Sequence, residues 1–143
     1  MGTRSTMKFI RKGNNKLTPL VSIYRQYDGY IDGVGHELAK YLLSKKIVNG
    51  IPINDNSGRI ANGFGCLIAQ YIRDFKTEPG NLYITDMDDK EEYNYEVIFD
   101  EDKYFDGEYN VDNLITIKVD SYPNFKGTPS ELLSFKESED DDD

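Results

Sequence analysis

The chain of 143 residues has few of the residue types that form many metal sites and disulfides: it has one cysteine and one histidine, and it also lacks tryptophan. The single cysteine, Cys66, excludes an internal disulfide and any site made of several thiolates. The single histidine, His36, excludes the zinc motifs that place two histidines at a fixed spacing. We therefore expect the protein to hold no metal and no cofactor.

Long hydrophobic runs are also missing. No segment approaches the roughly 18 apolar residues that a membrane-spanning helix needs. The start of the chain lacks the apolar region of a secretory signal, and no Asn-x-Ser/Thr acceptor for glycosylation occurs. These absences predict an intracellular protein without a membrane anchor.

Basic residues are outnumbered, with 17 Lys and Arg against 26 Asp and Glu, and the net charge is −9. The last seven residues hold six acids and no base, so residues 1–136 carry only −3. This balance argues against duplex nucleic acid and anionic membranes as partners. We expect one domain over 1–136 and a disordered acidic tail over 137–143. The tail is either a solubilising segment, or a decoy for a basic partner or a mimic of DNA.

Hydrophobic periodicity predicts an α+β fold. Phe64, Leu67, Ile68 and Tyr71 recur at helical spacing, whereas Tyr93 to Phe99 alternate in the manner of a half-buried strand. The expected order is ββ-α-α-βββ-(α), which predicts an antiparallel sheet of about five strands with two main helices packed on one face. The expected strands are 3–11, 20–27, 82–85, 93–99 and 114–120, and the expected helices are 34–46, 64–75 and a short one from 128.

Three stretches of the chain form a recognisable set of motifs. They are the start Met1–Ser5, the run Ile23–Tyr30 that continues to Gly33-x-Gly35 and Glu37-Leu38, and the segment Asn62–Gln70. They resemble a family of small proteins from bacteriophages, prophages and some large DNA viruses, which has a Met-Ala/Gly-Thr-Arg-Ser start, a Tyr-Arg/Cys-x-x-Asp-Gly-Tyr-Pro motif and a later Asn-Gly-Met-Gly-Cys-Leu-Ala-Ala-Gln helix. Ile31 stands where the family often has proline. The resemblance implies a viral or phage-type accessory protein in the host cytoplasm or the virion, and it implies no particular activity.

The densest group of chemically active side chains lies between a predicted strand and a predicted helix. The candidate catalytic bases are Asp28, His36 and Glu37. Together with Asp32, these side chains could also coordinate a metal ion or bind a ligand. The competing interpretation is structural, since Asp28 suits an Asx-turn and Asp32 suits a helix cap. The sequence leaves both interpretations open.

Arginines beside tyrosines suggest a place for a small anion or nucleotide. If the first two strands pair, Arg4 and Arg25 can lie near one another, and Tyr24 and Tyr30 can stack on a base. The alternative is that Arg25 forms a salt bridge with Asp28 or Asp32.

A second anion site is conceivable at the start of the second predicted helix. Arg59 and Asn62 lie there among Gly58, Gly63 and Gly65, and free N–H groups at a helix start attract anions. Alternatively, the glycines let the helix pack closely against its neighbours.

Two further features favour ordinary structural roles. Cys66 is more typical of a core residue than of a nucleophile paired with His36. The acidic runs 86–92 and 100–107 do not follow the EF-hand spacing, which favours solvated turns.

These features favour a non-enzymatic binding module for a host factor or a small anionic or nucleotide ligand. One alternative is a small hydrolase acting on a nucleotide or another phosphate compound. Another is a virion or assembly component whose tyrosines face a second subunit, and the tyrosine surplus also favours a homodimer.

Overall fold

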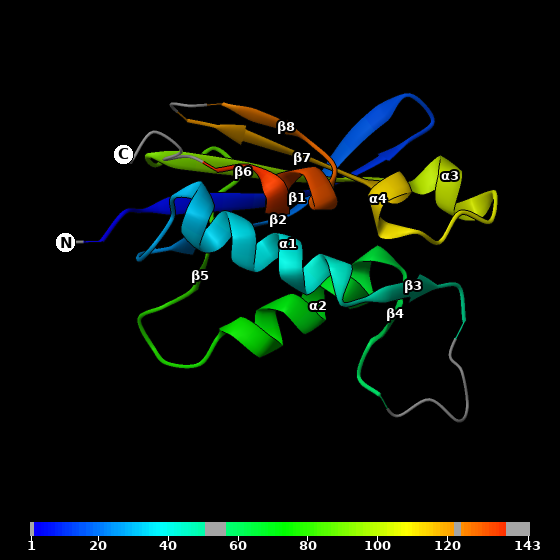
Figure 1. The fold of residues 1–143 in the computed structure, drawn as a ribbon, viewed down its shortest axis with the longest axis horizontal. Coiled ribbons are helices and arrows are strands. Elements are labelled where there is room, and N and C mark those ends of the chain that lie inside the picture. Colours follow the sequence, from blue (N-terminus) through cyan, green and yellow to red (C-terminus); the bar gives the residue numbers. More distant parts are fainter. Residues whose placement is uncertain (1, 51–56, 122–123, 137–143) are drawn as a thin grey trace.

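The computed structural model describes residues 2–50, 57–121 and 124–136, so the acidic tail lies outside the described residues (Figure 1). Its main sheet has six strands in the order β5-β2-β1-β6-β7-β8. The strands are β1 (Ser5–Gly13), β2 (Lys16–Arg25), β5 (Tyr83–Thr85), β6 (Tyr93–Asp100), β7 (Ile115–Asp120) and β8 (Phe125–Gly127).

The predicted α+β class is confirmed, with two differences in the sheet. It has six strands rather than five, and β1 and β6 pair in parallel, whereas every other neighbouring pair is antiparallel. The extra strand is β8, which pairs with β7 beyond the last predicted strand. The parallel pair arises because the chain leaves the β1–β2 hairpin, forms its helices, and returns to the free side of β1 in the same direction as that strand.

The β1–β2 hairpin is closed by Asn14 and Asn15, whose φ angles are 53° and 60°. Two successive positive φ angles define the type I′ turn that matches the twist of paired strands, and asparagine tolerates them. Gly13 therefore pairs with Lys16, and β2 begins four residues earlier than the hydrophobic pattern predicted.

The helices lie on one face of the sheet, as expected (Figure 1). On α2 (Gly63–Phe75), Phe64 stacks on Phe99 at 4.7 Å between ring centroids, and Tyr71 contacts Phe9 at 5.8 Å. A π-helical turn (Ile31–Gly35) leads into α1 (His36–Leu43), and α5 (Pro129–Ser134) packs between α1 and the β7–β8 edge. None of the helices in the described part of the chain is long and apolar enough to cross a membrane.

Short elements appear where the sequence predicted loops. Lys46–Val48 (β3) and Ile60–Asn62 (β4) form a separate two-stranded parallel sheet. The acidic stretch after β6 contains two short helices, α3 (Glu101–Phe105) and α4 (Val111–Leu114). They form because side chains just before them accept backbone hydrogen bonds: Asp100 caps α3 and Asn110 caps α4.

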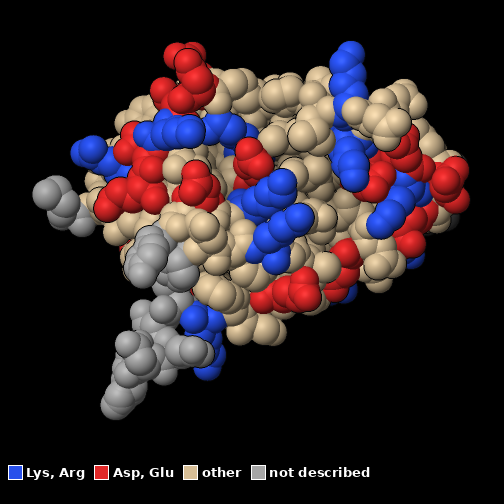
Figure 2. All heavy atoms as spheres, turned by 90° about the horizontal axis from the view of Figure 1, so that it is seen from above, with Lys and Arg blue, Asp and Glu red and all other residues tan. Residues whose placement is uncertain are grey.

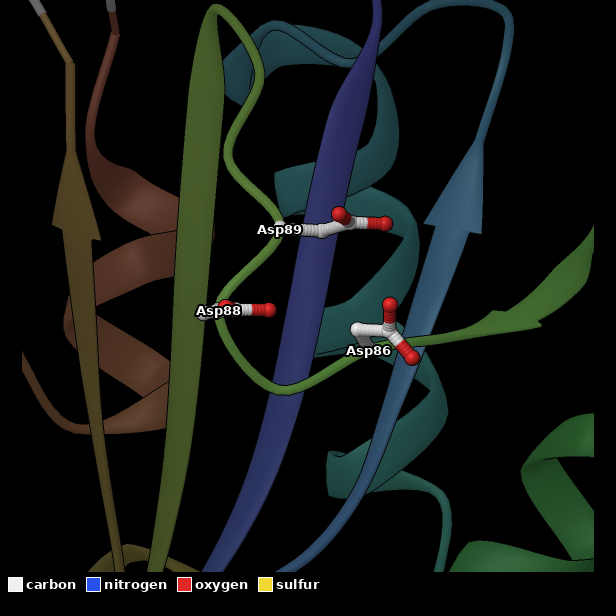
Figure 3. Close-up of side chains that lie close together, drawn as sticks. All are labelled: Asp86, Asp88 and Asp89. Atoms are coloured by element: carbon white, nitrogen blue, oxygen red, sulfur yellow. The ribbon is translucent and has the colours of Figure 1, made fainter.

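The segment between β5 and β6 crosses the face of the sheet that carries no helix. It must cross because β5 pairs with β2 and β6 pairs with β1 on the other side of the hairpin. The Lys8 Nζ donates a hydrogen bond to the backbone oxygen of Asp89 at 2.8 Å, which fixes the crossing over β1 (Figure 3).

Candidate functional site

The loop that follows β2 is held rigidly by backbone hydrogen bonds. The Gly29 N–H donates to the Thr3 oxygen at 2.9 Å, and the Val34 N–H donates to the Asp28 oxygen at 2.7 Å. The buried Tyr95 hydroxyl donates to the Gly29 oxygen at 2.8 Å. Asp28 has a φ of 57°, an angle that aspartate adopts more readily than most residues. The loop is thereby tied both to the start of β1 and to β6.

The side chains of this loop take positions different from those predicted. Asp32 does not cap the helix: it lies inside the first turn, and the capping position belongs to Tyr30. Its charge still lies at the positive end of the helical turn. The Asp28 carboxylate accepts a hydrogen bond from the Tyr30 hydroxyl at 3.2 Å.

Arg25 is the centre of a mostly buried polar cluster. Its Nη1 lies 3.1 Å from the Glu37 Oε1 and donates to the Tyr71 hydroxyl at 3.1 Å. Its guanidinium also lies 5.5 Å from the centre of the Phe75 ring. Arg25 therefore forms a salt bridge, as the alternative interpretation of the sequence predicted, but its partner is Glu37 rather than Asp28 or Asp32. The pairing holds the Glu37 carboxylate against the guanidinium.

A small hollow of ≈ 180 Å³ opens beside this cluster. The structure thus brings together Arg25, Asp28 and Glu37, three of the residues singled out in the sequence. The other candidates do not line it: they are Arg4, Tyr24, Tyr30, Asp32, His36, Arg59 and Asn62. The residues that line the hollow are Arg25, Tyr27, Asp28, Gly33, Val34, Glu37 and Asn81.

Strand geometry separates Arg4 and Tyr24 from Arg25. The strand partner of Arg25 is Ser5 rather than Arg4, and Tyr24 pairs with Thr6 on the opposite face of the sheet. Tyr24 contacts Tyr83 there, with 5.8 Å between ring centroids. The predicted clamp of two arginines and stacked tyrosines is therefore not assembled.

The anion site predicted at the start of α2 is not assembled either. Arg59 is exposed and precedes β4, so a strand separates it from the helix. The Asn62 Oδ1 accepts the Gly50 N–H at 2.8 Å instead of capping the helix. A Cβ at Gly58 or Gly65 would meet nothing within 4 Å, so close packing does not explain these two glycines.

His36 and Cys66 serve different parts of the structure. The His36 Nε2 lies 2.6 Å from the carbonyl oxygen of Phe135 and 3.8 Å from the Asp32 Oδ1. The contact with a carbonyl places the ring proton on Nε2, and it ties α1 to the end of α5. Cys66 packs against the hydrophobic core. These contacts support structural roles for both residues.

The face of the sheet without helices carries a feature that the sequence analysis missed. Two hollows of ≈ 410 and ≈ 470 Å³ lie on it and share Lys118 and Lys126. Basic side chains gather near the middle of this face, with acidic ones among and around them (Figure 2). We call the full set of residues that line either of the two hollows the lysine face. Its charged members are Lys8, Lys12, Lys16, Lys90, Lys103, Lys118 and Lys126, with Glu96, Asp100 and Asp120.

The lysine face has a local excess of four positive charges in a chain of net charge −9. Seven of the twelve lysines lie on it, and the larger hollow has five lysines and one carboxylate. Like charges also lie side by side, since Lys118 and Lys126 are direct partners across β7 and β8. Such pairs destabilise a sheet. Glu96 of β6 faces Lys118 from the other side, whereas Lys126 on the edge strand faces only Lys118 among the described strand partners.

The alternation of the strands explains how these lysines meet. Met7 and Phe9 point into the core, so Lys8 points to the open face, where it faces Glu96 of β6. Burial lowers the pKa of Lys8, against the opposing effect of nearby carboxylates. Two of these lysines, Lys8 and Lys118, lie at outward positions of strands that the sequence predicted, whereas the other five lie outside the predicted strands.

An acidic turn borders one end of this face. Carboxylate oxygens of Asp86, Asp88 and Asp89 lie within 4.8 Å of one another, and all three residues are exposed (Figure 3). The Thr85 hydroxyl donates a hydrogen bond to Asp89. The smaller hollow is the less basic of the two, because Glu96 and Asp120 line it beside four lysines.

Comparison of the chain with protein-family models, with curated proteins and with solved structures finds no match. The resemblance to phage and viral proteins therefore stays a prediction.

Proposed function

We propose that this protein is a non-enzymatic binding module and that its lysine face binds a small ligand carrying several phosphate groups. The observation that carries the proposal is the concentration of seven lysines on one open sheet face of an acidic chain.

The chemistry of the larger hollow supports such a ligand. Lysine is a compact positive charge that contacts phosphate oxygens, and hydrogen bonds between charged groups are stronger than neutral ones. A volume of ≈ 470 Å³ lies within the range of small-molecule sites, which is roughly 300–1,000 Å³. Lys118 and Lys126 border both hollows, so a ligand with two or more phosphates would contact both lysines.

The charge distribution also favours a small anion over a large one. Outside the lysine face the chain is strongly acidic, so a duplex or an anionic membrane would meet repulsion around the site. A compact polyanion held within the hollow avoids that repulsion.

Binding, rather than catalysis, agrees with the side chains proposed as bases. Glu37 is paired with Arg25, and His36 is occupied by the carbonyl of Phe135. In the setting implied by the resemblance, the protein would sequester an anionic metabolite in the host cytoplasm. The exposed edge strand β5, on which Ile84 is 62% exposed, supports a homodimer as its assembly.

Calorimetric titration with inorganic tripolyphosphate at 50 and 200 mM NaCl tests the proposal. The double variant Lys118→Gln/Lys126→Gln should bind at least about tenfold more weakly, because it loses two charge-assisted contacts. The matched control is Lys40→Gln/Lys46→Gln, which removes the same charge from exposed positions outside both hollows. Equal losses in the two variants, or no binding by the unaltered protein, would overturn the proposal.

A further inference from the structure

The end of the described chain is anchored at the β8 edge of the sheet, on the side that carries the helices. The Phe135 ring contacts Phe125 of β8, with 5.2 Å between ring centroids, and the Phe135 oxygen is held by His36. Since β8 is an edge strand of the sheet, the segment that follows Lys136 starts at that edge.

The lysines are within reach of that segment. Residue 126 lies on β8 itself, next to the anchoring Phe125, and its partner Lys118 is on the adjacent strand. Strands are spaced by about 4.8 Å, so β1 lies three spacings from β8 at about 14 Å. Seven extended residues span up to about 24 Å, which is enough to cross the lysine face from its β8 side.

The charges are complementary. Residues 137–143 contain six carboxylates and no base, whereas the lysine face has an excess of four positive charges. Lys118 faces Glu96 on β6, but the strand partner of Lys126 on the edge strand is Lys118, a like charge.

We propose that the acidic tail occupies the lysine face of its own chain and competes there with the anionic ligand. This inference rests on the proposed function only for the identity of the competitor. A tethered segment acts at an effective concentration of about millimolar, so even weak contacts keep the face occupied. The tail thereby sets a threshold: only a ligand that binds more tightly than a run of carboxylates displaces it.

Paramagnetic relaxation in the full-length chain tests this occupancy directly. A spin label at position 138 (Ser138→Cys, with Cys66→Ser) should broaden the amide signals of Thr116, Lys118 and Lys126 at low salt. Amides on α2, such as that of Arg73, should stay sharp. The broadening should fade at 500 mM NaCl and in the Lys118→Gln/Lys126→Gln variant, because both weaken the charge contact.

A mixture of spin-labelled and isotope-labelled molecules shows whether the tail on the lysine face belongs to the same molecule or to a second copy. Broadening that appears only in the mixture would identify the tail of a second copy and overturn the proposal. The absence of salt-dependent broadening would overturn it as well.

Titration with tripolyphosphate then measures the competition. A full-length variant with the six tail acids changed to their amides should bind about three- to tenfold more tightly than the unaltered chain at low salt. Equal affinities would refute the competition. If neither protein binds tripolyphosphate while the broadening persists, the proposed function fails and the tail contact stands.

Discussion

The hydrogen bond from Tyr95 to Gly29 offers the sharpest test of how the fold holds its loop. Tyr95 is fully buried on β6, and its hydroxyl donates to the Gly29 oxygen at 2.8 Å. Gly29 is also buried. The substitution Tyr95→Phe keeps the ring and removes only the donor, so it isolates this contact.

The expected loss of unfolding free energy is about 1–3 kcal/mol, because the buried Gly29 carbonyl is left without its donor. No large cavity adds to this cost, since the ring stays in place. Domains of this size are stable by roughly 5–15 kcal/mol, so the variant should remain folded. The Val34 amide, which donates to Asp28 in the same loop, should exchange its hydrogen faster.

Urea unfolding measures the loss. With a slope of about 2 kcal/mol per molar urea, a loss of 2 kcal/mol lowers the midpoint by about 1 M and leaves the slope unchanged. The matched control is Tyr24→Phe on the open face, where the hydroxyl bonds to no described residue; its effect should stay within about 0.5 kcal/mol. If the two variants are equally stable, the Tyr95 hydroxyl does not hold the loop.

Three further predictions concern other parts of the chain. In urea unfolding, Gly65→Ala should add up to about 1 kcal/mol, because the methyl meets open space on a helix, whereas Gly33→Ala should destabilise the protein by colliding with the Asp28 oxygen. A thermal melt of Thr128→Ala should show a loss of about 1 kcal/mol, because the capping box of α5 is removed. Hydrogen bonds from the adjacent arginine and from a tyrosine lower the pKa of Asp74 from 3.8 to about 2. Its ionised form therefore stabilises the fold above pH 4, and that contribution is lost as the pH falls toward 2, so Asp74→Asn should flatten acid unfolding over this interval.

The candidate site was predictable only where it depends on local features. The chain from Arg25 to Glu37 stands out by composition, and the structure does place Arg25, Asp28 and Glu37 around one hollow. The partner of Arg25 was not predictable. It depends on α1 packing against the sheet, which brings Glu37 to the guanidinium, and no spacing in the sequence encodes that contact.

The sequence by itself determined the elements whose pattern is local. The helix of Gly63–Phe75 follows from residues repeating every three or four positions, and the short helix after Thr128 follows from its capping residues. The α+β class follows from the segregation of strands and helices.

Only the tertiary structure decided which strands are neighbours. The parallel pairing of β1 with β6 joins segments about 88 residues apart, and a strand's side-chain pattern indicates which face is buried but not which strand lies beside it. The lysine face depends on that pairing, since the outward lysines of β1 meet those of β7 and β8 only when β6 lies between these strands. Its charge excess is therefore a property of the assembled sheet, and the acidic net charge of the chain conceals it.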